Sequence, residues 1–376
     1  MRQKKIEGKI KKDRKTKNLI KKLNPGDIAL ICHKNIDEVA AESLIKKKIK
    51  AVINTEPAIT GEYPNKGPEK ILKANIPVID NVGEKIYRIL KDGDKIKIIN
   101  GQIFLKEKAI ATGRVIDEII LNKILNETQK RMTALVDEFI ENTITYAKKE
   151  KWIVTHDLKL PEIETKIKNK HVLIAVRGKD YLQDLKAIKS YIEEVRPVLI
   201  GVDGGGDALL ESGFVPDILI GDMDSVSDKC LKNAKEIIVH AYQDGKAPGL
   251  NRISQLGLSA KLFPCLGTSE DVAMLLAYEK GAELIVAVGT HTNIIDFLEK
   301  GRKGMASTFL VRLKIGSKLV DAKGVNKLYK NKVSYKYLFA ICLAALWPII
   351  IVGLISPHFS YMLRLVRLKL KVMLGF

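Results

Sequence analysis

The apolar positions of this chain fall into short, closely spaced runs that predict β-strands. In the first third, strands are predicted at 27–32, 50–54 and 76–79, and amphipathic helices are predicted between them. Two further strands flank Asn100-Gly101, a dipeptide typical of hairpin turns. This alternation predicts a small α/β domain over residues 23–112. Over a short stretch, the sequence pattern of its last strands resembles that of swivelling β/β/α domains.

Residues 113–151 have a different character. They contain no proline, and their apolar side chains recur at helical spacing, so one long helical linker is predicted there. The apolar stripe of this helix either forms the seam of a homodimer or packs on a neighbouring domain.

Residues 170–325 alternate continuous apolar runs with helical stretches. Runs that are apolar throughout are typical of strands covered on both faces, as in parallel sheets. The order of strands and helices predicts a doubly wound α/β domain. Its strands are expected at 171–176, 197–202, 218–220, 236–239, 260–263 and 284–288.

The distribution of charge adds a second kind of information. The formal net charge of the 376 residues is +20. Residues 1–22 hold eleven basic and two acidic side chains, which predicts a basic N-terminal arm, and no acidic residue follows Asp321. The middle of the chain is nearly neutral, whereas a nucleic-acid-binding domain carries its positive charge on a folded face. The pattern argues against nucleic acid as a partner.

The C-terminal basic region brackets an uncharged stretch. Residues 337–356 contain no charged side chain, so a transmembrane helix is expected over 337–357. Basic flanks mark the cytoplasmic side and attract anionic lipid, which predicts an inner-membrane protein whose folded domains face the cytoplasm. The basic amphipathic tail, residues 358–376, either emerges outside or lies along the lipid headgroups. The four cysteines are scattered, so we expect neither zinc nor haem.

Candidate chemistry follows two of the predicted strands. Asp203-Gly204-Gly205-Gly206 comes directly after one strand, where small residues let a ligand approach the backbone. Asp222 and Asp224 follow the next strand, and two such carboxylates favour a cation between them. Oxygen ligands suit Mg²⁺ bound with nucleotide phosphates. The alternative is that these acids only cap and solvate a loop.

Ten residues of this segment form one motif: Asp203, Gly204, Gly205, Gly213, Pro216, Asp217, Gly221, Asp222, Asp224 and Ser225. In this motif the segment resembles the catalytic domain of thiamine pyrophosphokinases. The resemblance implies pyrophosphoryl transfer from ATP, with Mg²⁺ held by Asp222 and Asp224 as the catalytic carboxylates. It implies nucleotide binding by Asp203, Gly204, Gly205, Gly206 and Ser225.

Five runs of the chain carry a second resemblance: Arg14-Lys15-Thr16-Lys17, Pro25-Gly26-Asp27-Ile28-Ala29, Asp37-Glu38-Val39-Ala40-Ala41-Glu42, the run from Gly61 to Pro68 and the run from Gly301 to Leu310. With these runs, nearly the whole chain resembles a narrower family, the SteA-like proteins of the bacterial cytokinetic ring. That resemblance implies a role in cell division and division or envelope proteins as partners.

Two kinase motifs are altered. The kinase motif T-D-x-E falls on 268–271, where Ser269 replaces the aspartate and the carboxylates shift to Glu270 and Asp271, the further metal-ligand candidates. The thiamine-side motif G-G-R-x-D-H falls near 289–293, where neither the arginine nor the Asp-His pair occurs; His291 is either a base or a loop histidine. The run 301–308 either wraps a phosphate, through Arg302, Ser307 and Thr308, or forms a solvated turn.

Two functions are therefore expected from the sequence. In the first, a membrane-anchored division protein binds Mg²⁺ with ATP, another nucleotide or a diphosphate and does not turn it over. In the second, the chain is an active Mg²⁺- and ATP-dependent pyrophosphokinase at the inner membrane face. The altered motifs favour the first function.

Overall fold

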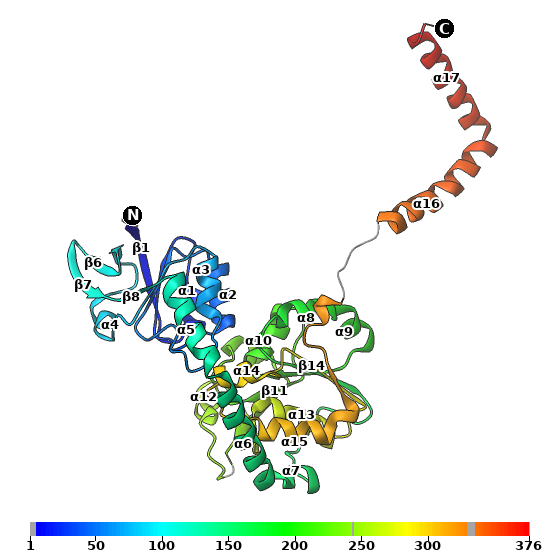
Figure 1. Cartoon of the computed structure of the whole chain (residues 1–376). Helices are drawn as coiled ribbons and strands as arrows, with labels where there is room; N and C mark the ends of the chain where they lie inside the picture. Colours follow the sequence, from blue (N-terminus) through cyan, green and yellow to red (C-terminus); the bar gives the residue numbers. More distant parts are fainter. Residues whose placement is uncertain (1–4, 243, 329–334, 376) are drawn as a thin grey trace. The chain divides into compact units, whose positions relative to one another are not determined.

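The computed structural model describes residues 5–242, 244–328 and 335–375 (Figure 1). The chain forms two compact units, Met1–Val325 and Asn326–Phe376. Within the first unit we distinguish an N-terminal lobe (5–116), linker helices (118–155) and a C-terminal lobe (171–325). Residues 1–4 of the expected arm, together with Lys330 and Lys332 of the second basic region, lie outside the described residues.

The N-terminal lobe is built on an eight-stranded mixed sheet in the order β7-β6-β5-β1-β2-β3-β4-β8. Strands β1 to β4 run parallel, whereas β5, β6, β7 and β8 pair antiparallel. The strands are β1 (Lys5–Lys12), β2 (Ile28–Ile31), β3 (Ala51–Asn54), β4 (Val78–Asp80), β5 (Lys95–Ile99), β6 (Gln102–Leu105), β7 (Lys108–Thr112) and β8 (Arg114–Ile116). The basic segment expected to be an arm thus supplies a strand in the middle of the sheet.

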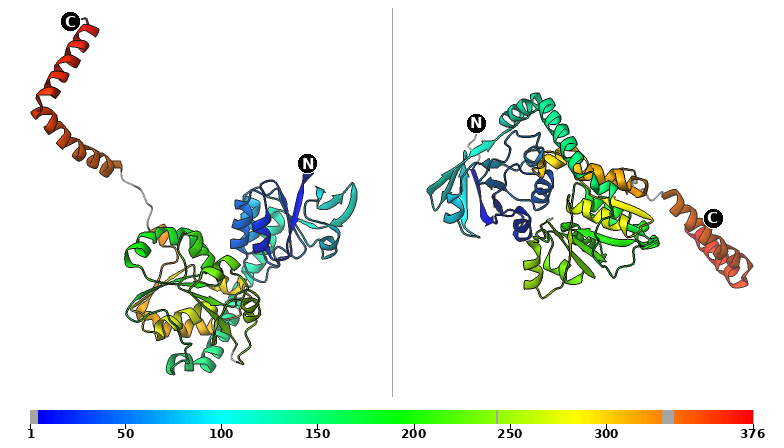
Figure 2. Two further views of the ribbon diagram at one scale, coloured as in Figure 1. Left: turned by 180° about the vertical axis from the view of Figure 1, so that it is seen from behind. Right: turned by 90° about the horizontal axis from the view of Figure 1, so that it is seen from below.

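Both faces of the sheet are covered at β2, β3 and β4, which explains why these three strands are buried at every position. Ala29 and Ile31 of β2 pack in one cluster with Leu44 of the helical layer, while Ile28 and Leu30 pack in another with the hairpin strands. The helices are α1 (Thr16–Lys22), α2 (Glu38–Lys46), α3 (Gly67–Lys73) and α4 (Lys85–Ile89). The views of Figures 1 and 2 place β6, β7 and α4 on the other side of β1 from α1, α2 and α3.

The linker is divided, not one long helix as predicted. It consists of α5 (Glu118–Lys130), α6 (Met132–Glu150) and α7 (Trp152–Thr155). The break at Arg131 has a tertiary cause, because the carbonyl oxygen of Gly61 accepts hydrogen bonds from the Thr128 hydroxyl at 3.2 Å and from the Arg131 guanidinium at 3.3 Å. On α6, Ile140 and Ile144 are about half exposed beside an apolar pocket of about 490 Å³. A homodimer through this helix stays a prediction.

The C-terminal lobe has the doubly wound parallel sheet that its apolar runs predict. Its order is β13-β12-β11-β10-β9-β14-β15, and all its pairs are parallel. The chain moves outward from β9 to β13 and then crosses back to β14 on the other side of β9. Ligands of such sheets bind at the carboxyl ends of the strands beside this reversal. The strands are β9 (His171–Ala175), β10 (Val198–Val202), β11 (Ile218–Gly221), β12 (Glu236–Ala241), β13 (Lys261–Pro264), β14 (Leu284–Val288) and β15 (Leu319–Asp321).

Helices cover both faces of this second sheet. Val172 and Ile174 of β9 pack in a cluster with α13 and α15, whereas Leu173 and Ala175 pack in a cluster with α8, α9 and α10. The helices are α8 (Tyr181–Ala187), α9 (Lys189–Val195), α10 (Gly204–Glu211), α11 (Asp228–Asn233), α12 (Gly249–Gln255), α13 (Ser269–Glu279), α14 (Ile294–Glu299) and α15 (Ala306–Ile315), with short 3₁₀ turns at Gly316–Lys318 and Val325–Lys327.

The second unit consists of α16 (Tyr335–Ile355) and α17 (Pro357–Met373). Within the described part of the chain, neither these nor any other helix is long and apolar enough to cross a membrane, so the expected transmembrane helix at 337–357 is wrong. That expectation rested on a lack of charge, but a span requires one helix with about 20 consecutive strongly apolar residues. The helix contains Pro348 and ends at Ile355, and a new helix begins two residues later.

Candidate functional site

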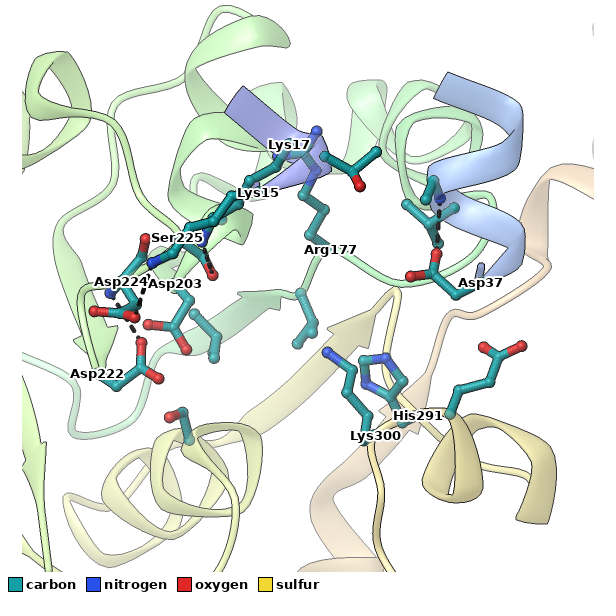
Figure 3. A pocket seen from close by; sticks show the side chains of 18 of the residues that line it. Lys15, Lys17, Asp37, Arg177, Asp203, Asp222, Asp224, Ser225, His291 and Lys300 are labelled. Atoms are coloured by element: carbon teal, nitrogen blue, oxygen red, sulfur yellow. Dashed lines mark hydrogen bonds and ion pairs between the residues drawn. The ribbon is translucent and has the colours of Figure 1, made fainter. Parts of the chain in front are cut away.

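A pocket of about 730 Å³ lies at the carboxyl ends of β9, β10, β11 and β14, and the N-terminal lobe forms its other side (Figure 3). Its volume falls in the usual range for small-molecule sites. The charged residues that line it in the C-terminal lobe are Arg177, Asp203, Asp222, Asp224, Glu270, His291, Glu299, Lys300 and Arg302, and those of the N-terminal lobe are Arg14, Lys15, Lys17, His33 and Asp37.

The structure brings Asp203, Asp222 and Asp224 together, as the sequence predicts for the ends of neighbouring strands. Asp222 accepts a hydrogen bond from the backbone N–H of Asp224 at 2.9 Å, and Asp203 accepts one from the N–H of Met223 at 3.2 Å. Asp203 and Met223 have φ angles of +47° and +64°, which are unfavourable for residues with a side chain. Strained backbone of this kind is common where a site imposes its geometry.

Gly221 makes the approach of Asp203 possible. A Cβ atom at residue 221 would lie 1.9 Å from Oδ1 of Asp203, so any other residue would push the carboxylate away. The glycine of the matching motif therefore shapes the acidic group without contributing a side chain to it.

Asp203 has an altered proton affinity. Burial, followed by the nearby charge of Asp222, raises its pKa to about 7. Crowded carboxylates have this effect on one another when nothing neutralises them, and a bound cation reverses it. The donor set consists of carboxylate oxygens alone, which are ligands suited to Mg²⁺.

The three glycines after Asp203 have different positions. Gly204 lines the pocket. Gly205 lies behind it, and a Cβ there would be 1.9 Å from the carbonyl oxygen of Ala175. Gly205 is thus required for the close packing of α10 on the sheet, and Gly206 is buried in the same layer.

Glu270 and Asp271 are adjacent in sequence but face different neighbours. Glu270 lines the pocket and forms an ion pair with His291, whose backbone N–H also donates to it at 3.1 Å. Burial would raise the pKa of Glu270, but the hydrogen bond and charge of His291 lower it below the usual range.

Asp271 is buried under the pocket. Its Oδ2 accepts hydrogen bonds from the N–H of Thr268 at 2.9 Å and from the hydroxyls of Ser307 at 2.9 Å and Thr308 at 3.0 Å. These bonds tie the start of α13 to the start of α15. Arg302 and Thr308 line the pocket, whereas Ser307 is engaged by Asp271 behind it.

Sequence reasoning missed the cations on the other side of the pocket. Lys17 donates to the carbonyl oxygen of Asp224 at 2.8 Å and to the hydroxyl of Ser225 at 3.0 Å, and Lys15 lies 3.4 Å from the Asp224 carboxylate. Arg177, two residues after the end of the buried β9, was also missed. A charged residue at the end of an apolar strand was the signal for Arg177, but a distant basic run gives no such signal for the lysines.

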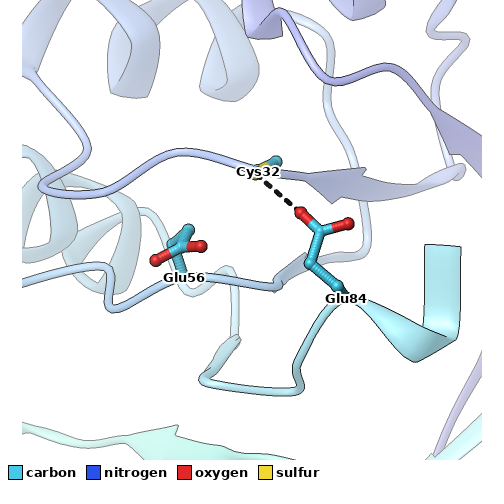
Figure 4. A group of neighbouring side chains, drawn as sticks. All are labelled: Cys32, Glu56 and Glu84. Atoms are coloured by element: carbon cyan, nitrogen blue, oxygen red, sulfur yellow. Dashed lines mark hydrogen bonds between the residues drawn. The ribbon is translucent and has the colours of Figure 1, made fainter.

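A second group of potential metal ligands lies in the N-terminal lobe, where Cys32, Glu56 and Glu84 approach one another within 4.8 Å (Figure 4). Glu84 is exposed and accepts from the Cys32 thiol at 3.5 Å. It also forms an ion pair with Arg14 at 2.7 Å, so its charge is already balanced.

Comparisons with known proteins match both expected resemblances. Residues 323–374 match the family described as the SteA-like C-terminal domain. Thiamine pyrophosphokinase from Bacillus subtilis is 21% identical over 40% of this chain and 60% of that chain, with a TM-score of 0.26. The enzyme from Geobacillus thermodenitrificans is 21% identical over 40% and 58%, with a TM-score of 0.25.

A third solved structure, 3-isopropylmalate dehydratase from Methanocaldococcus jannaschii, is 14% identical over 35% of this chain and 97% of that chain, with a TM-score of 0.21. No curated protein matches the chain. The chain spans about 60% of the length of the pyrophosphokinases that it matches.

Proposed function

We propose that the pocket binds Mg²⁺ together with a nucleotide or a diphosphate. The observation that carries this proposal is the convergence of Asp203, Asp222 and Asp224 at one edge of a pocket whose other walls carry cations. Mg²⁺ bound by these carboxylates would supply a positive centre for phosphate oxygens. The chain's own contribution is to hold the three carboxylates at fixed positions, through Gly221 and the two strained residues.

The test is a titration of the full-length protein with ATP, ADP and inorganic pyrophosphate, each with Mg²⁺ and with EDTA. Mg²⁺-dependent binding of at least one probe, seen as heat by calorimetry and as a rise in melting temperature, is the expected result. Binding that is equal in EDTA would remove the metal from the proposal, and no binding of any probe would overturn it.

Binding without turnover is favoured over an active pyrophosphokinase. At the altered motif, Ser269 lies 3.3 Å from the ring of His240, and no carboxylate occupies that position. Phosphoryl transfer depends on metal and donors fixed within a fraction of an ångström, so the loss of one ligand position lowers the rate by many powers of ten. Formation of thiamine diphosphate from thiamine and ATP at about 1 per second would instead establish the kinase.

A role in cell division is proposed from the similarity of residues 323–374 to the SteA-like C-terminal domain. A fluorescent fusion of the whole chain, expressed in the bacterium that carries it, is expected to gather at the division septum. An even distribution through dividing cells would contradict this role.

We also propose that α17 lies on an anionic lipid surface. Phe359, Leu363, Val366 and Leu370 follow one another at helical spacing and are exposed, and Arg364, Arg367 and Lys371 lie on a different side of the helix. Such a helix buries its apolar stripe at the headgroup level while its cations contact lipid phosphates.

Vesicle flotation tests this surface. The full-length protein is expected to float with vesicles of phosphatidylglycerol and not with phosphatidylcholine, and the R364E/R367E/K371E variant is expected to stay in solution. Equal flotation of the variant would contradict the proposal.

A further inference from the structure

Two lysines of the N-terminal lobe reach the acidic group of the C-terminal lobe. Lys17, on α1, donates to the carbonyl oxygen of Asp224 at 2.8 Å and to the Ser225 hydroxyl at 3.0 Å. Lys15, just before the helix, lies 3.4 Å from the Asp224 carboxylate. Figure 3 shows both side chains extended toward the loop that carries Asp222 and Asp224. More than 200 residues separate the partners in each pair.

The neighbouring cations have partners in their own lobe. Lys12 donates to the carbonyl oxygen of Tyr87 at 2.7 Å, Arg14 pairs with Glu84 at 2.7 Å, and Lys22 pairs with Asp13 at 2.7 Å. The basic run therefore has two kinds of members. Lys12, Arg14 and Lys22 bind partners within the N-terminal lobe, whereas Lys15 and Lys17 reach out of it to Asp224 and Ser225.

The contacts of Lys17 leave its charge without a close anion. Both of its hydrogen-bond partners are neutral oxygens, and the side chain is partly buried. Burial, and then the charge of Lys15, lowers the pKa of Lys17. Arg177 enters the same region from the end of β9 (Figure 3). Three cations thus converge beside three carboxylates, and Lys15 pairs with Asp224 at 3.4 Å while the hydrogen bonds of Lys17 go to neutral oxygens.

We propose that Lys15 and Lys17 are phosphate-binding residues, supplied by the N-terminal lobe to a site that both lobes complete. This inference rests on the proposed function. A ligand with two or more linked phosphates matches both halves, because some of its oxygens can share a cation with Asp222 and Asp224 while others accept from the lysines and Arg177. A ligand with a single carboxylate has too few anionic oxygens to share a cation with the aspartates and accept hydrogen bonds from the lysines at the same time.

Ligand binding then joins the two lobes. The ligand lies between residues near 15 and residues near 224, so its affinity depends on their approach and its presence stabilises that approach. The inference names the ligand class, a diphosphate or nucleoside polyphosphate with Mg²⁺, and it gives the N-terminal lobe a direct part in recognition.

The experiment uses the full-length protein, with ATP and inorganic pyrophosphate in the presence of Mg²⁺ as probes. The K15A/K17A variant is expected to bind each probe about 100-fold more weakly, since two charge-assisted hydrogen bonds are lost. K17Q, which retains hydrogen bonding but removes the charge, should bind about 10-fold more weakly. Lys21 is exposed on the same helix, so K21A is the matched control and should bind as the wild type does.

Hydrogen exchange supplies a readout that does not depend on affinity. Mg²⁺-ATP is expected to slow exchange in residues 14–22 of the wild type and of K21A, and not in K15A/K17A at matched occupancy. Unchanged affinity of K15A/K17A and K17Q would overturn this inference while leaving the proposed function intact. An equal loss of affinity in K21A would also overturn this inference, because the loss would then reflect the positive charge of the helix in general. If the wild type binds no probe at all, the proposed function fails and this inference fails with it.

Discussion

The C-terminal lobe contains two groups of acidic residues, one at the ends of β10 and β11 and one in the first turn of α13, and they differ in what surrounds them. Asp203, Asp222 and Asp224 lie together with few donors, held by backbone N–H groups and a glycine that admits Asp203. Glu270 and Asp271 are fully engaged, the first by His291 and the second by Thr268, Ser307 and Thr308. Carboxylates that resemble one another in sequence thus divide into a group that lines the pocket with few donors and a group whose partners lie within the fold.

The largest effect is expected when two carboxylates of the first group, Asp222 and Asp224, are replaced. The double change Asp222→Asn and Asp224→Asn should weaken Mg²⁺-dependent binding of ATP more than 100-fold, because two charged ligands become neutral. Both side chains are exposed, so the melting temperature should stay within about 2 °C of the wild type. Calorimetric titration measures the affinity for ATP, and a thermal scan measures the melting temperature.

The control for this change is Asp244→Asn, which removes one exposed charge outside the pocket. That variant should bind ATP normally. If the double variant also binds normally, the acidic group has no part in ligand binding.

The next largest effect is expected on protein stability, when Asp271 of the second group is replaced. Asp271→Ala leaves three buried donors without their acceptor, which should lower the free energy of unfolding by about 3 kcal/mol. Urea unfolding of the full chain measures the loss. Asp271→Asn keeps an acceptor oxygen and should recover part of it, and a stability equal to the wild type in both variants would contradict the structural role.

A carboxylate in neither group sharpens the comparison. Burial and the charges of Asp37, Glu38 and Asp296 raise the pKa of Glu299 to about 7 from 4.5, against the opposite effect of Lys179. The folded state therefore binds this proton more tightly than the unfolded state, so the contribution of Glu299 to stability is fully present below about pH 4.5 and is lost as the pH rises through 7.

Glu299→Gln removes that dependence. The variant should exceed the wild type in stability at pH 8 by about 2 kcal/mol, which is less than the full shift implies because solvent screens the partly exposed side chain. The difference should be smaller at pH 5, and urea unfolding at both pH values measures it. A difference that does not change between the two pH values would show that Glu299 keeps its ordinary pKa.

The smallest effect concerns the ion pair between the lobes. Lys15 and Asp224 are 3.4 Å apart, with side chains 57% and 65% exposed. An exposed pair of this kind contributes little, so Lys15→Ala should change the free energy of unfolding by less than about 0.5 kcal/mol. A larger loss in urea unfolding would mean that this pair contributes to the stability of the folded lobes.

Much of the fold could be predicted from the sequence, because buried strands are apolar throughout and leave a strong local signal. The strand 284–288 is found with the predicted bounds, and β2 and β3 differ from the prediction by one or two residues. The break in the linker helix could not be predicted. It depends on the contact of Thr128 and Arg131 with Gly61, about 70 residues earlier in the chain.

The candidate site also has residues that could be predicted from the sequence and residues that could not. Asp203, Asp222 and Asp224 could be predicted, since each follows a strand and parallel strands end at one edge. Lys15 and Lys17 could not, since nothing local indicates that their lobe closes the pocket. The transmembrane helix was predicted from a lack of charge, which is a necessary property of a span and not a sufficient one.

The position of β1 has a consequence for how the protein is made. This strand is the first described segment to be synthesised, yet it joins two parts of the sheet by pairing with β2 on one side and with β5, near residue 97, on the other. The nascent chain cannot complete the sheet until β5 has left the ribosome, and until then one edge of β1 stays open to other strands. Lys15 and Lys17 follow soon after β1, but their contacts with Asp224 and Ser225 can form only after those residues, more than 200 positions later, have also emerged.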